Sequence, residues 1–312
     1  MCGIAGIISP HPLEGVLARM VRAMRHRGPD DHGTIEICAG ERSVSLASTR
    51  LAILDLTPAG HMPMLDPASG NSIVFNGEIY NFRDIRRELE SEGERFTSGT
   101  DTEVVLKGYR RWREGVVERL QGMFAFAVWD QGRQELFLAR DRLGEKPLYY
   151  HQGPRGSFLF GSEVRALLAS EQIERRLNSE ARDIYLFNGF LVSPITAANA
   201  VRSLLPAHWI RVSSDGRILE NARYWTPTAR PASDGLDPTS GLARQMERAV
   251  RMRLISDVPL GAFLSGGLDS STIVAMMARL GQKVRTVSVA FDEADHDESA
   301  YALWVARRFA TD

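Results

Sequence analysis

The sequence predicts an α+β domain followed by an α/β domain with a parallel sheet. Three observations support this fold class. The 312 residues exceed the roughly 100 to 200 residues typical of one domain. The first part of the chain carries neighbouring strand patterns with a few helices between them, which is typical of α+β layers. From residue 238 onward, strand and helix patterns alternate as in a parallel nucleotide-binding sheet.

The composition is that of an ordinary globular protein. Apolar residues at 44% and charged residues at 25% allow a sizeable core. The formal net charge of -1 gives no reason to expect nucleic acid or an anionic membrane as a partner. No apolar run reaches the roughly 18 residues of a spanning helix, and the N-terminus lacks a basic segment followed by an apolar one. We therefore expect a cytoplasmic protein.

Cysteine and histidine usage limits the redox and metal chemistry. The chain has two cysteines, Cys2 and Cys38, which cannot form a disulfide framework. Cys38 lies in the alternating pattern TIEICAG and is expected to be a small buried side chain. The seven histidines lack the spacing of metal ligands and no C-x-x-C is present, so no zinc site is expected.

Apolar spacing places the elements of the first domain. Residues 2–8 have a strand pattern, and apolar residues at helical spacing predict a helix over Leu13–Met24. Two more helices are expected over 81–92 and 101–112, and the second begins with a capping box of Thr100 and Glu103. Further strands are expected at 34–38, 43–48, 72–77, 124–130 and 135–141.

The chain changes character between Trp225 and Gly241, where Pro, Ser, Gly and Thr replace large apolar residues. This change predicts a first domain at 2–225, a linker at 226–237 and a second domain at 238–312. The second domain is shorter than the usual range of about 100 to 150 residues, and two parallel strands leave a sheet edge open. We therefore expect it to be incomplete. Its strands are expected at 258–264 and 284–291, and helices at its start, over 271–280 and at its end.

A glycine-rich loop, LSGGLDSS at Leu264–Ser271, joins the first of these strands to a helix. Such a loop presents free backbone N–H groups and the positive end of the helix dipole to an anion, which favours phosphate. Without a lysine, the loop differs from the common NTPase loop G-x-x-x-x-G-K-[ST]. The alternative is an ordinary turn capped by Asp and Ser.

The loop SGGLDSS resembles the pyrophosphate loop of the ATP pyrophosphatases, and with SDVPLGAFL before it the chain resembles glutamine-hydrolysing asparagine synthetase. The resemblance covers nearly the whole chain. It implies an αββα N-terminal-nucleophile sandwich, followed by the first part of an α/β ATP-pyrophosphatase domain. In the first domain it rests, in order, on MCGIAGI, RHRGPD, RLAILD, NGEIYN, SGTDTE, LQGMFAFAVWD and RDRLGEKPLYY.

The resemblance implies that Cys2 is a nucleophile that hydrolyses glutamine. Removal of Met1 would give Cys2 a free α-amino group, whose pKa of about 7.7 to 8.0 lets it take the thiol proton. The thiolate then attacks the side-chain amide, forms a thioester and releases ammonia. The Asn76 side chain and the Gly77 N–H are expected to bind the oxyanion. Asn-Gly alone is also typical of a tight hairpin turn.

Glutamine recognition requires partners for its α-carboxylate and α-ammonium groups. Arg50 offers a bidentate fork to the carboxylate, and Glu78 and Asp101 offer negative charge to the ammonium. Each alone would be an ordinary surface charge, and the resemblance is what singles them out. His26 is expected to order its loop rather than to act in catalysis. The pocket wall is expected to include the backbone of Leu51, Ala52, Ile53 and Leu54.

For the second domain the resemblance implies that ATP activates aspartate as β-aspartyl-AMP and that ammonia, carried inside the protein, converts it to asparagine. Asp269 is the candidate Mg²⁺ ligand. A segment of the form Ser-Gly-Glu-Gly-x-Asp-Glu, which the family uses for the intermediate, is absent. Two alternatives stay open: another carboxylate acceptor, or a remnant with a glutaminase or binding role. A homodimer is also compatible with the resemblance. The ATP-binding candidates are Leu264 and Val289 around adenine, and Ser265, Gly266, Gly267, Asp269 and Ser270 in the loop.

Overall fold

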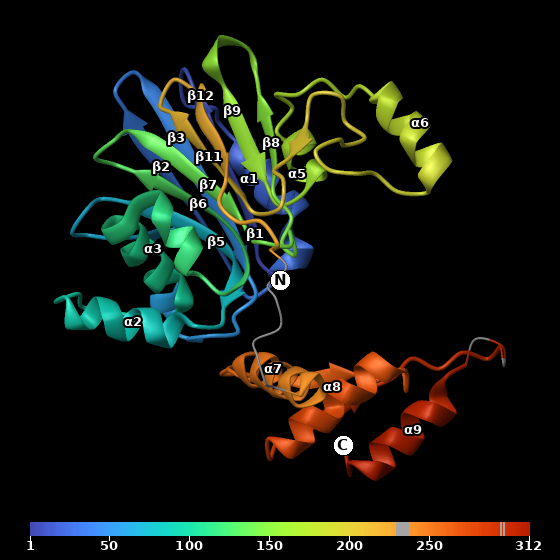
Figure 1. The fold of residues 1–312 in the computed structure, drawn as a ribbon. Coiled ribbons are helices and arrows are strands. Elements are labelled where there is room, and N and C mark those ends of the chain that lie inside the picture. The colour runs from blue at the N-terminus through green and yellow to red at the C-terminus, as the bar shows by residue number, and fades with distance from the viewer. Residues whose placement is uncertain (229–236, 294, 296) are drawn as a thin grey trace. The chain divides into compact units, whose positions relative to one another are not determined.

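The computed structural model describes residues 1–228, 237–293, 295 and 297–312. The chain divides into two compact units, Met1–Pro227 and Thr228–Asp312 (Figure 1). Most of the predicted linker at 226–237 falls on residues 229–236, which lie outside the described residues. Among the described residues, no helix is long and apolar enough to cross a membrane.

The first unit is built on two antiparallel sheets of six strands each. In the second sheet most neighbouring strands follow one another in the sequence, whereas the first sheet also pairs β1 with β9 and β8 with β10 across long stretches of chain. The first sheet has the order β10-β8-β9-β1-β3-β2 and the second β12-β11-β7-β6-β5-β4. The bounds are β1 Gly3–Ser9, β2 Asp31–Ala39, β3 Arg42–Arg50, β4 Met64–Leu65, β5 Ser72–Ile79, β6 Gly122–Asp130, β7 Glu135–Arg140, β8 Tyr149–Gln152, β9 Phe158–Gly161, β10 Arg202–Ser203, β11 His208–Ser213 and β12 Ile218–Arg223.

The sheets pack face to face and helices cover their outer faces. One buried cluster joins Ile4 and Leu46 of the first sheet to Val74 and Trp129 of the second. Helices α1 and α5 pack on the outer face of the first sheet. Helix α3 packs on the second, where the ring centroids of Tyr109 and Phe137 are 5.2 Å apart. This arrangement confirms the αββα sandwich (Figure 1). The helices are α1 Val16–Ala23, α2 Phe82–Ser91, α3 Asp101–Trp112, α4 Val116–Arg119, α5 Val164–Ala169 and α6 Ser179–Asn188.

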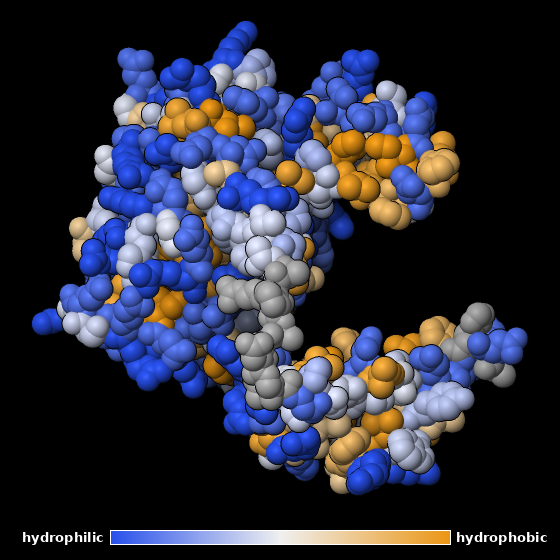
Figure 2. All heavy atoms as spheres, viewed as in Figure 1, coloured by the Kyte–Doolittle hydropathy of each residue, from blue (hydrophilic) through white to orange (hydrophobic). Residues whose placement is uncertain are grey.

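Helix α6 stands outside these layers. Only Ala181 of its ten residues is buried. Leu186 and Phe187 are 76% and 90% exposed, and Figure 2 shows apolar side chains gathered over this helix. It therefore adds little to the core of the sandwich.

Two local predictions need correction. The helix predicted over Leu13–Met24 begins only at Val16, because Gly15 has a φ of 69° and lies in the left-handed region. The prediction that Cys38 is buried was wrong, because Cys38 is exposed. Side chains of β2 alternate between the two faces, so Ile37 turns inward and Cys38 turns outward.

The capping box at α3 forms only in part. The Thr100 side chain accepts the Glu103 N–H at 3.2 Å, as predicted. The Glu103 carboxylate instead accepts the N–H groups of Thr97 and Ser98, at 2.9 and 2.7 Å. Glu103 therefore anchors the preceding loop rather than the N-cap residue itself.

The second unit holds a parallel pair of strands with helices around it. β13 (Gly261–Phe263) and β14 (Arg285–Val287) run parallel, which confirms the α/β class. Both strands are shorter than predicted, since each has only the other as a neighbour within the described residues. The helices are α7 Pro238–Met252, α8 Leu268–Arg279 and α9 Ser299–Arg308. The buried core of this unit consists of Leu264, Val274, Met277, Val284, Ala302 and Val305.

Candidate active site

Cys2 lies directly before β1, next to the end of β3. Gly3 is the register partner of Thr49, so Cys2 and Arg50 lie at the same end of the sheet. The Cys2 Sγ–H donates to the Leu51 carbonyl at 3.8 Å. Burial is the main cause that raises the pKa of this thiol. With Met1 still attached, the thiol is therefore held in its protonated form.

Asn76 and Gly77 lie within β5, opposite Ala125 and Phe124 of β6. Asn-Gly is therefore not a hairpin turn here. A Cβ on Gly77 would lie 2.3 Å from the Met123 carbonyl oxygen, so the strand pairing requires glycine at this position. Asn76 is fully buried, yet neither its Oδ1 nor its Nδ2 has a hydrogen-bond partner among the described residues.

A buried amide without hydrogen-bond partners destabilises the folded state by on the order of 1–3 kcal/mol. Such a group is retained where a ligand completes its hydrogen bonds. β5 also contacts β1 between the two sheets, so the strand that carries Asn76 lies beside the strand that follows Cys2. The Asn76 amide is therefore a candidate hydrogen-bonding group on the strand beside β1.

Glu78 and Asp101 form a pair of acids next to this amide. Glu78 follows Gly77 on β5, and Asp101 begins α3 and accepts the Ile79 N–H at 2.8 Å. Burial, then repulsion by Asp101, raises the pKa of Glu78 to about 8. Burial raises the pKa of Asp101 to about 6. Both carboxyls also raise the pKa of the Cys2 thiol, which places all three groups in one electrostatic site.

Arg50 and the loop after β3 form another side of the site. The Arg50 side chain is buried and its Nη2 donates to the carbonyls of Leu54 and Asp55, at 2.9 and 2.6 Å. Arg50 thus shapes the loop that was predicted as the pocket wall. Its charge lowers the pKa of Asp101, so the two groups lie within electrostatic range of each other.

Three charged residues near Cys2 were not predicted as site residues from the sequence: Arg27, Lys146 and Glu163. Arg27 Nε donates to the Cys2 carbonyl at 2.9 Å. Lys146 is 7% exposed, and burial lowers its pKa whereas Glu78 raises it. Arg27 and Lys146 lie in RHRGPD and RDRLGEKPLYY, motifs already noted, so the signal was present without a role attached.

His26 has the position expected of a loop-ordering residue. Its Nε2 lies 2.9 Å from Glu163 Oε1, and its side chain is 49% exposed. Because the described contacts of His26 run to Glu163 rather than to Cys2, this geometry favours the structural role.

The loop after β13 has the geometry of an anion site. Gly266 has a φ of +84°, and a Cβ there would lie 2.5 Å from Tyr301 Cβ. The hydroxyls of Ser265 and Ser270 are 3.1 Å apart, and the Gly267 N–H donates to Ser265 Oγ at 3.3 Å. No side chain of the described residues caps the N-terminus of α8, so its first N–H groups can donate to a phosphate.

The other nucleotide candidates lie beside this loop. Leu264, Ser265 and Val289 line one small pocket of the second unit. Asp269 lies in the first turn of α8 and is exposed. Among the described residues, no group of three or more acidic, His or Cys side chains could hold a metal alone. Asp269 therefore fits Mg²⁺ only as one protein ligand beside phosphate oxygens, the usual manner for this ion.

A cysteine at position 2 directly before the first strand of an αββα sandwich, with an amide nearby that is buried and without partners among the described residues, is the arrangement expected of an amidotransferase. Residues 1–225 match the family described as glutamine amidotransferase domain, and residues 241–312 match the family described as asparagine synthase. The chain belongs to the glutamine amidotransferase family and carries part of an asparagine synthase domain.

Relatives of known name support this membership. The chain is 38% identical over 308 residues to asparagine synthetase [glutamine-hydrolyzing] 3 of Bacillus subtilis, which covers 95% of this chain and 49% of the relative. It is 36% identical to putative asparagine synthetase [glutamine-hydrolyzing] 2 of Methanocaldococcus jannaschii, over all of this chain and 64% of the relative. The chain thus spans about half to two thirds of these relatives.

Two further matches bear on acceptor and fold. Amidase chry2 of Gibberella zeae is 32% identical over 99% of this chain and 49% of its own length. Among solved structures, glutamine phosphoribosylpyrophosphate amidotransferase from B. subtilis matches with a TM-score of 0.55 and 16% identity, over 92% of this chain and 65% of that one. At this identity the structural match supports the fold alone.

Proposed function

We propose that residues 1–225 hydrolyse glutamine to glutamate and ammonia, with Cys2 as the nucleophile. The observation that carries this proposal is the Asn76 amide, fully buried and without partners among the described residues, on the strand beside β1. A tetrahedral oxyanion at Cys2 would be stabilised by the Asn76 Nδ2–H and the Gly77 N–H. The Asn76 Oδ1 remains free to accept a hydrogen bond from the substrate.

The base for this reaction would be the α-amino group of Cys2 after Met1 is removed. In the structure the chain begins at Met1, and burial is the main cause that lowers the pKa of its amine. Lys146 and Arg27 also lower it, whereas Cys2 and Asp30 raise it. An amine on Cys2 would lie near the same charged groups, and burial there would favour its neutral form. It could then take the thiol proton and later protonate the departing ammonia.

Glutamine would be selected through its charged α-groups. Glu78 and Asp101 would bind the ammonium, which would add a positive charge next to this buried acid pair. Arg50 would hold the α-carboxylate with donors not used on the Leu51–Leu54 loop. Ammonium binding would lower the pKa of both acids and keep them ionised.

We further propose that the whole protein is a glutamine-dependent asparagine synthetase. The family match at 241–312 and the names of the relatives support it. ATP would bind at Leu264, Ser265 and Val289 and on the loop with Asp269, and would activate aspartate as β-aspartyl-AMP with release of diphosphate. Ammonia would then displace AMP to give asparagine. The relative named an amidase keeps open a different carboxylate acceptor.

A first test replaces the nucleophile. Cys2→Ala should abolish glutamate release from glutamine, and intact-mass analysis of the active protein should show that Met1 is absent. Glutamate release near the unmodified rate in Cys2→Ala would overturn the proposal. Diphosphate release from ATP with aspartate, compared with other carboxylates, tests the acceptor.

A further inference from the structure

A second group of contacts, from the segment between β9 and α5, holds the main chain around Cys2. Ser162 is fully buried. Its N–H donates to the Ile4 carbonyl at 2.9 Å, and its Oγ accepts the Ile4 N–H at 3.0 Å. The residue two positions after the cysteine is thus fixed through both of its backbone groups.

Glu163, the next residue, acts on Cys2 itself through one side chain. Its Oε1 accepts Arg27 Nη1–H at 3.0 Å, and the same guanidinium donates its Nε–H to the Cys2 carbonyl at 2.9 Å. The Arg27 side chain is 8% exposed and that of Glu163 is 16% exposed, so this pair is little screened by water.

Two other side chains contact Glu163. His26 Nε2 lies 2.9 Å from Oε1, and Arg165 Nε lies 2.8 Å from Oε2. Hydrogen bonds from Arg27 and His26 keep the pKa of Glu163 below its ordinary value, although burial acts in the opposite direction. The carboxylate therefore stays ionised and binds the guanidinium in one orientation.

We propose that Glu163 is a positioning residue for the Cys2 nucleophile, acting through Arg27. This inference rests on the proposed glutaminase function. Cys2 carries both the thiol and, after processing, the amine that deprotonates it, and its carbonyl is the point at which Arg27 fixes the residue. Reaction requires a near-attack distance of about 3–3.5 Å, and misplacement by about 1 Å can cost about a hundredfold in rate.

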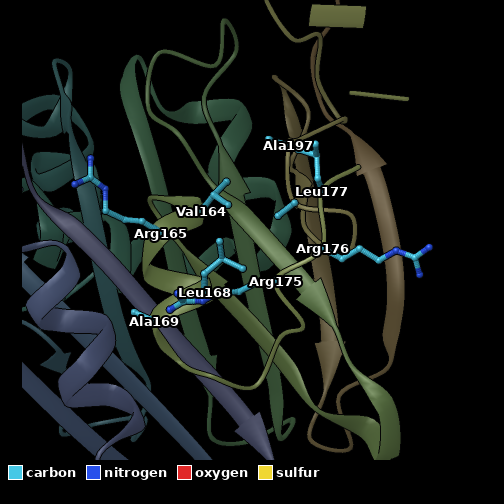
Figure 3. Close-up of a pocket in the computed structure, with 9 residues that line it drawn as sticks. Val164, Arg165, Leu168, Ala169, Arg175, Arg176, Leu177 and Ala197 are labelled. Atoms are coloured by element: carbon cyan, nitrogen blue, oxygen red, sulfur yellow. The ribbon is translucent and has the colours of Figure 1, made fainter. Parts of the chain in front are cut away.

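The chain offers two matched controls at the neighbouring helix α5. Glu171 lies just after α5, is 65% exposed and pairs with Arg19 at 3.6 Å, without contact to Arg27 in the described part of the chain. Leu168 lines a cavity on α5, and Figure 3 shows Arg165 and Arg176 pointing away from that cavity in opposite directions. Glu171→Gln removes a surface ion pair, and Leu168→Ala loosens α5 without touching Glu163.

The test measures glutamine hydrolysis and alkylation of Cys2 by iodoacetamide in the 312-residue chain, with Cys38→Ser throughout so that one thiol reacts. Glu163→Ala should lower kcat by about ten- to a hundredfold, with KM changed less than about twofold, and should slow alkylation. Glu163→Gln, which keeps one acceptor oxygen, should restore part of both rates. Glu171→Gln and Leu168→Ala should leave both rates unchanged.

Thermal unfolding of each variant separates positioning from folding. An unchanged kcat in folded Glu163→Ala, or a loss that only follows the folded fraction, would overturn the inference. So would equal losses in Leu168→Ala. If Glu163→Ala does not fold, the rates of Glu163→Gln decide in the same way. Activity that persists in Cys2→Ala would instead overturn the glutaminase proposal, so the two failures are distinct.

Discussion

At the scale of single residues, the site is defined by groups that the fold leaves without partners or with an unfavourable charge. Asn76 has a buried amide without described partners, and Glu78 and Asp101 are raised in pKa by burial. Each group would be more stable with a ligand than without one. The free-energy cost of burying these groups without partners would be recovered when a ligand binds to them.

Replacing Asn76 should separate activity from stability. We expect Asn76→Ala to lower kcat for glutamine hydrolysis by about a hundredfold to a thousandfold, as for loss of one oxyanion donor. Its melting temperature should be equal or higher, because a buried amide without partners is removed. Steady-state kinetics and calorimetry provide both measurements.

Asn71 is the matched control for this prediction. It is 2% exposed, and its Oδ1 accepts the Gln131 N–H at 3.0 Å. Asn71→Ala should lower the melting temperature and leave kcat of the folded protein unchanged. The reverse pattern in the two variants would contradict the assignment of Asn76.

The acid pair predicts a pH dependence of glutamine binding. Glu78, with a pKa of about 8, and Asp101, with a pKa of about 6, must both ionise to hold an ammonium. The Kd of glutamine, measured by calorimetry on Cys2→Ala, should fall as the pH rises from about 6 to about 8. Glu78→Gln should weaken binding and flatten this profile. A glutamine Kd that stays constant over this pH range in Cys2→Ala with Glu78 unchanged would refute the prediction.

The same shift predicts how stability without ligand changes with pH. The folded-state pKa of Glu78 lies above its ordinary value of 4.5, so between pH 4.5 and 8 the folded state binds more protons than the unfolded state. The free energy of unfolding should therefore fall as the pH rises through this window, by on the order of 1 kcal/mol per pH unit. Denaturant titrations at several pH values should show that the free energy of unfolding of Glu78→Gln changes less with pH. An equal change with pH in both proteins would exclude Glu78 as the cause.

Motif order in the sequence named Cys2, Asn76, Glu78 and Asp101, and the structure brings these residues to one region. The motif order did not indicate Glu163, because its contact with Arg27 joins residues that are 136 positions apart in the sequence. Contacts of that separation depend on sheet order and register, which a single sequence does not encode as a local pattern. Residue type and motif were therefore sufficient to name candidate reacting groups, but not the residues that contact them.

At the scale of elements, local signals decided which predictions were accurate. α3 has the predicted bounds Asp101–Trp112, because Thr100 provides a true N-cap. The start of α1 was wrong because Gly15, with its positive φ, interrupts an otherwise regular apolar spacing. The alternation in β2 was correct, but the sequence alone could not say which face of that strand turns inward.

The loop before α8 should depend on Gly266 for steric reasons. Alanine there would have to adopt a φ of +84° and would place its Cβ 2.6 Å from the Ala302 N. Gly266→Ala should destabilise the second unit by more than the roughly 1–2 kcal/mol of a left-handed alanine, and should impair ATP-dependent diphosphate release. Glutamine hydrolysis should be unaffected. The expected loss is measured by denaturant unfolding and by diphosphate assays.

Gly281 provides the control for this substitution. It also has a positive φ, of +77°, but a Cβ at this position would have no described atom within 4 Å. Gly281→Ala should therefore show the conformational cost without the clash. Equal destabilisation by both substitutions would contradict the steric explanation.

At the scale of the whole molecule, two compact units carry two separate sets of candidate residues. Asp269 belongs to the second unit, whereas Cys2 belongs to the first. Asp269→Ala should lower ATP-dependent diphosphate release by at least about tenfold and change glutamate release by less than about twofold. Parallel assays of the two products test this separation, and an equal loss of both would show that the two reactions are coupled.

The outward position of Cys38 has a practical consequence for work on the intact molecule. β2 is an edge strand of its sheet, and the thiol of Cys38 lies on its exposed side. Two copies that meet at this edge in air-oxidised buffer can join through a disulfide between these thiols. Such a covalent pair would imitate a native dimer on a sizing column, so the number of subunits has to be measured with a reductant present.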